Sequence, residues 1–185
     1  LAWAQIGGVV FIGDCGFGMP RPPIKHELPD SQHCMAVSCD AKRAVVTSAK
    51  SVHVIDLALC IVARKLQTSS NVRSLCMTRD DRFCILGHLS GSITVWNTAT
   101  WTQVRTLTGG HDADLADNFI TALVTTPDGK TLVSSAGDSH IIVWDLATGQ
   151  VCRMIDLPVA AESLCLSPPD APTRIIIGCH YGTIR

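Results

Sequence analysis

The sequence lacks several features that mark large classes of proteins. It has no apolar run of about 18 residues, so we expect no membrane-spanning helix. Its formal net charge is only −1, and few aromatic residues lie near its basic ones, which argues against a nucleic-acid surface. The first residues, Leu1-Ala2-Trp3, carry no basic segment before an apolar one, so we expect no signal peptide.

Motifs of catalysis and cofactor binding are also missing. The sequence contains neither a G-x-S-x-G motif nor a Cys–His protease signature. The glycine-rich stretch 7–18 is followed by prolines and lacks the Lys and Ser or Thr of a phosphate-binding loop. His26, His33, Cys34 and Cys39 cluster without the paired spacing of a zinc site. We therefore expect no catalytic residue, no cofactor and no metal, and we predict that the chain is not an enzyme.

Cysteine, in contrast, is abundant, and its nine copies are an odd number. Cys76 and Cys165 both follow Ser-Leu, and Cys84 lies in an apolar run, where cysteine acts as a small apolar residue. This usage favours a reducing compartment over secretion. We expect the protein in the cytoplasm, with the nucleus as the alternative.

The most informative feature that the sequence does have is an internal repeat. The string Thr94-Val95-Trp96-Asn97 recurs 48 residues later as Ile142-Val143-Trp144-Asp145, and the offset holds without a gap from residue 78 to 97. Apolar and polar residues alternate within each copy, and clusters of Gly, Asp and Ser separate the runs, as in β-hairpins. A period of about 40–50 residues is typical of proteins built from four-stranded blades.

Looser copies lie on both sides of this pair. Residues 86–94 align with 177–185, and 52–56 align with 93–97, with Ile55 in place of the tryptophan. We predict one blade in each of four segments, the third with an acidic insert and the last truncated at Arg185: 35–66, 67–107, 108–157 and 158–185. The segment 1–34 matches poorly. There we expect a strand at 9–14 from a preceding blade, followed by a loop from Cys15 to Pro29.

The third unit resembles the WD40 repeat family. It carries, in order, Gly110-His111, Pro127-Asp128-Gly129-Lys130, Leu132-Val133-Ser134, Asp138 and Trp144-Asp145. The resemblance implies an all-β fold, a β-propeller of four-stranded antiparallel blades. The ring would be incomplete in this chain. Because open sheet edges invite pairing, further blades are expected from a parent chain or a partner.

In that family a hydrogen-bonded tetrad ties each blade together. By position, the resemblance implies His111, Ser134, Asp138 and Trp144 for the third unit, as a structural set and not a catalytic triad. The second unit lacks the set, because Ser90 stands at the Asp position and no Gly-His precedes it. We therefore expect the first and second units to be held by packing more than by such a tetrad.

The strongest candidate for partner binding is the acidic insert that follows the tetrad histidine. Its charge would steer a basic peptide and its leucine would anchor it, through Asp112, Asp114, Leu115 and Asp117. The alternative is a solvated insertion without a role, since surface loops tolerate extra length. A second candidate is Trp101, in a short turn where Gly149 stands in the third unit; it is either a contact residue or a cover for the adjacent blade.

These observations predict a non-catalytic scaffold that mediates protein–protein interactions in a multiprotein assembly. One alternative is a regulatory or sensor propeller attached to an enzymatic domain outside this chain. Another is an RNA-associated propeller in an RNA-processing complex. The expected partners are proteins or peptides, with neither a membrane nor a nucleic acid among them.

Overall fold

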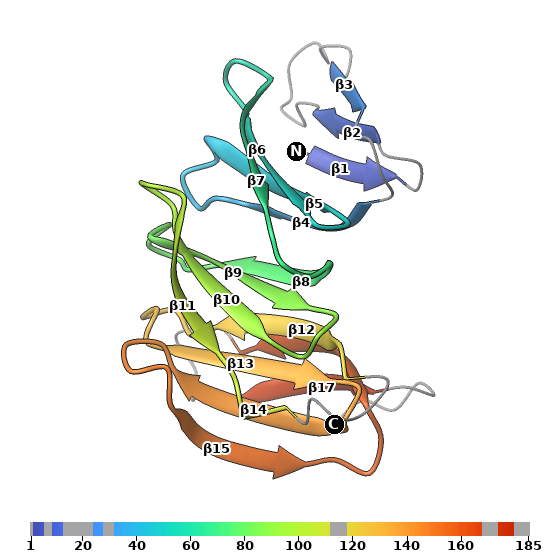
Figure 1. Cartoon of the computed structure of the whole chain (residues 1–185), viewed down its shortest axis with the longest axis vertical. Helices are drawn as coiled ribbons and strands as arrows, with labels where there is room; N and C mark the ends of the chain where they lie inside the picture. The colour runs from blue at the N-terminus through green and yellow to red at the C-terminus, as the bar shows by residue number, and fades with distance from the viewer. Residues whose placement is uncertain are drawn as a thin grey trace. The chain divides into compact units, whose positions relative to one another are not determined.

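The computed structural model describes residues 2–5, 9–12, 24–27, 32–111, 118–167 and 174–179. In that part of the chain every regular element is a β-strand, and every pairing with a defined register is antiparallel (Figure 1). It holds no helix long and apolar enough to cross a membrane. The chain divides into two compact units, Leu1–Val72 and Arg73–Arg185, which are described one at a time.

The first unit contains a three-stranded and a four-stranded sheet. The three-stranded sheet has the order β1 (Ala2–Gln5), β2 (Val9–Ile12), β3 (Ile24–Glu27). The four-stranded sheet has the order β4 (Gln32–Val37), β5 (Arg43–Ser48), β6 (Ser51–Asp56), β7 (Ile61–Gln67). Ala44, Val46 and Ile55 are fully buried and form its core with Met35 and Leu57.

The prediction that Cys15 to Pro29 is only loop is wrong at Ile24–Glu27. This segment forms β3 and pairs with β2 in the register Val9↔Glu27 to Ile12↔Ile24. The segment is short and bounded by prolines, so its sequence shows little alternation. Pairing with β2 satisfies its backbone donors and acceptors, and that long-range interaction decides its conformation.

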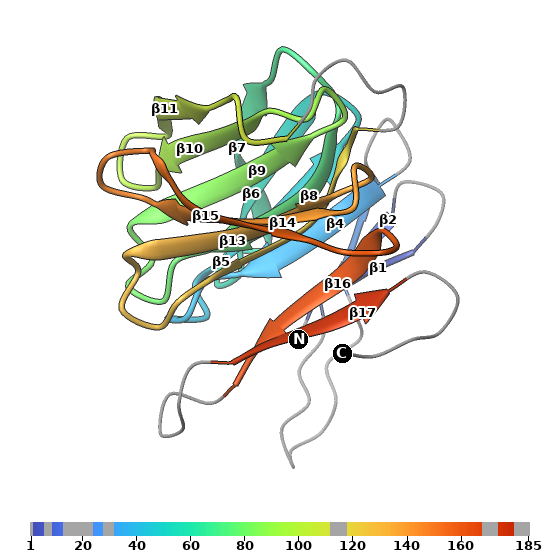
Figure 2. The same cartoon turned by 90° about the horizontal axis from the view of Figure 1, so that it is seen from below.

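The second unit contains two four-stranded sheets and a two-stranded one. The first has the order β8 (Val72–Met77), β9 (Phe83–His88), β10 (Ile93–Asn97), β11 (Thr102–Leu107), and Val72 at its start is the last residue of the first unit. The second has the order β12 (Ile120–Thr125), β13 (Thr131–Ala136), β14 (His140–Asp145), β15 (Val151–Asp156). The strands β16 (Ala161–Leu166) and β17 (Ile175–Cys179) pair in the third, drawn in red in Figure 2.

One apolar core joins the first two sheets of this unit. Its buried members come from both sheets: Ile85, Ile93, Val95, Leu107, Ile120, Leu123, Leu132, Ala136, Ile142 and Trp144. A second cluster joins Val133 and Ile141 to Ala161 of β16. Each sheet therefore covers a face of the next, which removes apolar area from water and stabilises the stack.

Hydroxyl groups connect the first strands of consecutive sheets. Ser74 Oγ in β8 donates a hydrogen bond of 3.0 Å to the carbonyl of Ile120 in β12. Thr121 Oγ1 in β12 donates one of 2.6 Å to the carbonyl of Ala161 in β16. In both cases the acceptor is the first residue of the next sheet, so the repeat extends to the contact between sheets.

The same turn joins the first and second strands in all three four-stranded sheets. In each, a Ser or Thr hydroxyl donates to an Asp carboxylate two residues later, at 2.6 to 2.7 Å: Ser38–Asp40, Thr78–Asp80 and Thr126–Asp128. The carboxylate also accepts the backbone N–H of Lys42, Arg82 or Lys130. A residue with positive φ follows each Asp: Ala41 (53°), Asp81 (55°) and Gly129 (69°). The turn is therefore fixed by local hydrogen bonds and not by glycine alone.

These hydrogen bonds favour the ionised carboxylate. The hydroxyl and the backbone N–H hold the pKa of Asp40 and of Asp128 below the ordinary 3.8. Desolvation raises the pKa of Asp80, but the hydrogen bonds from Thr78 and the Arg82 N–H outweigh it, so its pKa is also lowered.

This lowering predicts a loss of stability in acid. A carboxylate whose native pKa lies below its unfolded value stabilises the fold above about pH 4 and loses that effect as the pH falls through the native pKa. We expect the unfolding free energy of the D80N/D128N variant to fall less steeply than that of the parent below about pH 4. Urea denaturation across that range measures both slopes, and equal slopes would contradict the role of the turns.

Gly87 in β9 has no room for a side chain. An ideal Cβ there would lie 2.5 Å from Ile120 Cγ2 and still closer to the Ser74 hydroxyl. Gly178, at the matching place in β17, meets Ser163 in the same way.

The third repeat, strands β12 to β15, avoids this crowding with a different pair of residues. In β13 the corresponding residue is Ser135, and its register partner in β12 is Ala122. Glycine opposite serine is thus exchanged for serine opposite alanine, which keeps the combined volume small enough for close packing.

The exchange predicts a coupling that can be measured. Gly87→Ala should lower the unfolding free energy by about 1–3 kcal/mol through overpacking. In the background of Ser74→Ala the same change should cost less, because one of the two crowded groups is gone. Chemical denaturation of the parent, both single variants and the double variant gives the coupling, and strictly additive losses would refute it.

Candidate functional site

The four residues of the expected tetrad come from separate places in the chain and meet inside one sheet. Ser134 lies in β13, Trp144 in β14, Asp138 in the turn between these strands, and His111 ahead of β12. Ser134 Oγ is 2.8 Å from both His111 Nε2 and Trp144 Nε1. His111 Nδ1 is 2.8 Å from Asp138 Oδ2. The chain of contacts therefore runs from the indole through the hydroxyl and imidazole to the carboxylate.

Donor and acceptor chemistry assigns the protons in this chain. The indole N–H of Trp144 can only donate, so Ser134 Oγ accepts from it. The carboxylate of Asp138 only accepts, so the His111 Nδ1 that faces it carries a proton and donates, while Nε2 faces the Ser134 hydroxyl. Every buried polar group in the set then has a partner.

Asp138 also fixes the turn in which it stands. Its Oδ1 accepts the backbone N–H of His140 at 3.0 Å, while the His140 ring lies 3.6 Å from Oδ2. The side chains of His111 and Asp138 are both fully buried. The backbone at Gly110 lies close to the Trp144 ring, and only glycine fits there, because an ideal Cβ would lie 2.6 Å from Trp144 Cζ2.

This geometry does not serve nucleophilic catalysis. Ser134 is 0% exposed, and its hydroxyl is already hydrogen-bonded to His111 and Trp144. A nucleophilic hydroxyl must reach a substrate and an oxyanion site, and a fully buried one does neither. The arrangement is suited to holding a sheet together.

The second repeat, strands β8 to β11, holds a polar network that sequence reasoning missed. Trp96 Nε1 donates to Thr94 Oγ1 at 3.0 Å, and Thr94 Oγ1 lies 2.8 Å from His88 Nε2. All three are buried, with His88 at 0% exposure. The second repeat does not carry the family tetrad, and this network of three residues adds to its apolar packing.

The difference from the tetrad has a simple geometric cause. In the third repeat the hydroxyl that accepts from the tryptophan is Ser134 in β13. In the second repeat it is Thr94 in β10, two residues before Trp96. A search at the family positions finds Leu86 there instead of a serine. The available signal was a histidine and a threonine six residues apart in otherwise apolar strands. The first unit differs again, because its tryptophan position holds Ile55, fully buried in an apolar core.

The predicted partner-binding residues have different fates. Asp112, Asp114, Leu115 and Asp117 lie outside the described residues. Trp101 is only 6% exposed, so it is not an exposed anchor in this structure. It has a φ of 56° and occupies the same place in its turn as Cys60 (54°) and Gly149 (78°).

An Asp or Asn before each of these turns caps it. Asn97 accepts the N–H groups of Ala99 and Thr100, and Asp145 accepts that of Thr148. The acid that follows the tryptophan in the repeat thus has a local role, which explains why Asn replaces Asp without loss of the turn.

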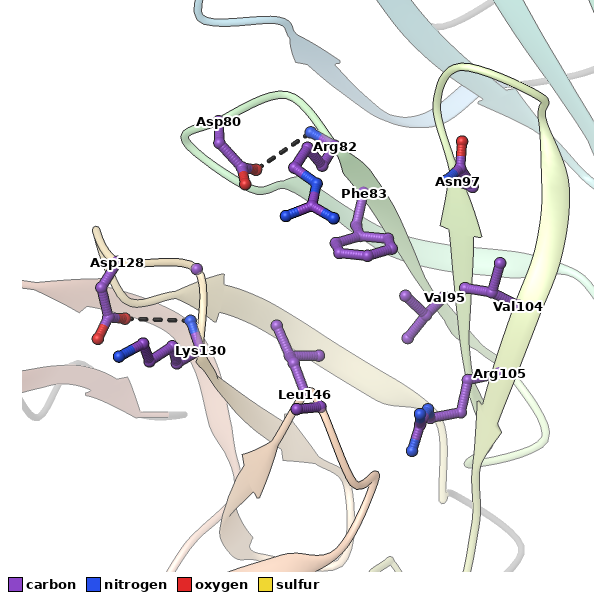
Figure 3. A pocket seen from close by; sticks show the side chains of 12 residues that line it. Asp80, Arg82, Phe83, Val95, Asn97, Val104, Arg105, Asp128, Lys130 and Leu146 are labelled. Carbon is purple, nitrogen blue, oxygen red and sulfur yellow. Dashed lines mark hydrogen bonds between the residues drawn. The ribbon is translucent and has the colours of Figure 1, made fainter.

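A groove lies between the turns of the first two sheets of the second unit (Figure 3). It has a volume of about 610 Å³, and it is lined from both sheets by Asp80, Arg82, Phe83, Val95, Asn97, Val104, Arg105, Asp128, Gly129, Lys130, Leu146 and Ala147. The repeat places the two turns at equivalent positions, but the apolar lining comes from four further places in the chain. Sequence reasoning did not find it for that reason. Within the described residues no group of three His, Cys, Asp or Glu side chains could hold a metal.

Comparison with known proteins agrees with this architecture. The family described as "WD domain, G-beta repeat" (WD40) matches residues 101–145, which include the His111, Ser134, Asp138 and Trp144 set. The match identifies a WD40-type repeat in this part of the chain. The matched part is the repeat in which the buried network includes all four expected residues.

Individual relatives place that match in context. The "Anaphase-promoting complex subunit cdh1" of Dictyostelium discoideum is 33% identical over 100 residues, which cover 54% of this chain and 11% of the relative. The chain thus spans about a tenth of that curated relative. A solved structure titled "Structure of U3-55K" is similar with a TM-score of 0.68 over 85% of this chain and 54% of the other. At 16% identity this likeness shows the fold alone.

Two hydroxyl deletions test whether the networks of the second and third repeats are equivalent. Ser134→Ala leaves two buried groups without a partner and should cost about 2–4 kcal/mol of unfolding free energy. Thr94→Val keeps the shape but removes the acceptor of Trp96, and we expect a loss of about 1–3 kcal/mol.

The control is Ser90→Ala, at an exposed turn position, which should change the stability by less than about 0.5 kcal/mol. Equilibrium denaturation followed by tryptophan fluorescence measures all three variants. If Thr94→Val left the unfolding free energy unchanged, apolar packing alone would hold the second repeat.

Proposed function

We propose that this protein is a non-catalytic scaffold that brings other proteins together in a multiprotein assembly. The observation that carries the proposal is the buried Trp144–Ser134–His111–Asp138 chain within the WD40 match. The polar residues that resemble a catalytic set are used up as internal structure. What the described residues offer to other molecules is surface, at turns held rigid by their own hydrogen bonds.

The relatives support protein partners without identifying them. One similar protein is named as a subunit of a complex, and it matches over a small part of its length. Repeats of this kind present several rigid turns to solvent, a suitable base for contacts with more than one protein.

We further propose a reducing compartment, the cytoplasm or the nucleus. Cys84 and Cys179 are buried among apolar residues, as expected of cysteine that serves as a small apolar side chain. Desolvation raises the pKa of the Cys76 thiol to about 12, so this thiol stays protonated and unreactive at neutral pH.

The acidic insert remains our proposed first contact for a partner. We expect that replacing Asp112, Asp114, Leu115 and Asp117 together by Ala removes a defined set of proteins from those captured by the tagged full-length protein. The physical reason is the loss of steering charge and of the apolar anchor. Quantitative mass spectrometry of parent and variant captures measures it, with a thermal melt as the folding check.

A matched control replaces two highly exposed charged side chains elsewhere, Lys42 and Asp156, by Ala. If the insert variant captures the same proteins as the parent, the insert is a surface loop without a role in partner binding. Capture of no protein by the parent would refute the scaffold itself.

A further inference from the structure

The groove between the two four-stranded sheets of the compact unit Arg73–Arg185 has an apolar part and a charged part. Its apolar part is made by Phe83, Val95, Val104 and Leu146. Val95 is buried at 4% exposure, whereas Val104 is 51% exposed. Figure 3 shows Leu146 across the gap from Phe83 and Val95. An apolar side chain from another molecule would therefore find contacts on both sides.

The charged part of the groove contains three cations and two carboxylates. The cations are Arg82, Arg105 and Lys130, and the carboxylates are Asp80 and Asp128. Each carboxylate already accepts a hydroxyl and a backbone N–H of its own turn. The lining therefore carries a net charge of +1, and its acceptors are more fully used than its donors.

Two of the three cations, Arg82 and Arg105, pack against neighbouring groups. The Arg82 guanidinium lies 5.6 Å from the ring centroid of Phe83. Arg105 lies against the turn of the next sheet, where an ideal Cβ at Gly149 would be 2.9 Å from its Nη1. Such preorganisation lowers the entropy cost of binding an anion.

We propose that this groove binds an extended peptide in which an acidic side chain neighbours an apolar one. The apolar side chain lies on Phe83, Val95 and Leu146, and the carboxylate accepts hydrogen bonds from Arg105 and Lys130. The proposal rests on the scaffold function and gives it a contact surface separate from the acidic insert.

Charge and ring chemistry favour a peptide over a nucleic acid. The lining has one aromatic ring, Phe83, and the Arg82 guanidinium lies over it. With Arg82 over one of its faces, this single ring does not provide the row of stacking platforms that successive bases use. A nucleic-acid backbone repeats its negative charge, so it would meet Asp80 and Asp128, whereas a single carboxylate can reach Arg105 without them.

The repeat supplies matched controls for a test. Arg153 in β15 pairs with Val143 as Arg105 in β11 pairs with Val95, so it stands at the same strand position in another sheet. Lys42 follows Asp40 in its turn as Lys130 follows Asp128. The double variant K42E/R153Q thus makes the same chemical changes as K130E/R105Q outside the groove.

The experiment selects peptides from a random library displayed on phage, with the full chain as the target. Enriched peptides are then synthesised and their affinity is measured by fluorescence polarisation. We expect sequences that combine an acidic with an apolar residue, bound at least roughly tenfold more weakly by K130E/R105Q. We expect the affinity of K42E/R153Q to be that of the parent. Circular dichroism checks the fold, and V104D, at an exposed position, is the second groove variant.

The proposal fails if no peptide is enriched, if the enriched peptides are basic, or if the groove variants bind them like the parent. It also fails if a twelve-nucleotide oligouridine binds the parent and the groove variants weaken that binding, because the ligand is then a nucleic acid. Partners still captured by K130E/R105Q but lost with the insert variant would overturn the groove alone and leave the scaffold standing.

Discussion

The need of each β-sheet to cover its apolar face governs the structure of the second unit. A single four-stranded sheet leaves Ile85, Val95 or Ile142 with one side in water, and only the next sheet removes that exposure. The side-by-side first strands follow from this, as do the hydroxyl bonds from Ser74 and Thr121 to the carbonyls of the neighbouring sheet. Positions at the contact must stay small, as Gly87 and Gly178 do.

Burying a tryptophan in such a core creates a second constraint. Its indole N–H needs an acceptor, and an unpaired donor in the interior costs free energy. Trp144 and Trp96 both donate to a hydroxyl that also contacts a histidine, but the hydroxyls belong to different strands. The first unit avoids the need altogether with Ile55. A repeat can therefore keep its backbone while each copy satisfies its buried polar groups in its own way.

Local turn chemistry shapes the groove between these two sheets. The hydroxyl–carboxylate pairs at Thr78–Asp80 and Thr126–Asp128 fix two turns, and the sheets set those turns beside each other. Their cations then face a shared apolar floor. Because the turns are held by their own hydrogen bonds, the proposed peptide would cost the groove little conformational freedom.

The sequence by itself determined the elements that depend on neighbours along the chain. Period-two alternation and turn residues located the strands of the second and third units, and the recurrence of Trp96 and Trp144 identified the repeat. Through the resemblance to WD40 repeats, the order of Gly110, His111, Ser134 and Asp138 implied a buried hydrogen-bonded set. Only the tertiary structure decided that Ile24–Glu27 pairs as a strand and that Phe83 and Leu146 share a groove. It also decided that Thr94, and not a serine, accepts the tryptophan N–H in the second repeat. Each of these depends on contacts between residues distant in the chain, and such contacts are set by packing, which local sequence patterns do not encode.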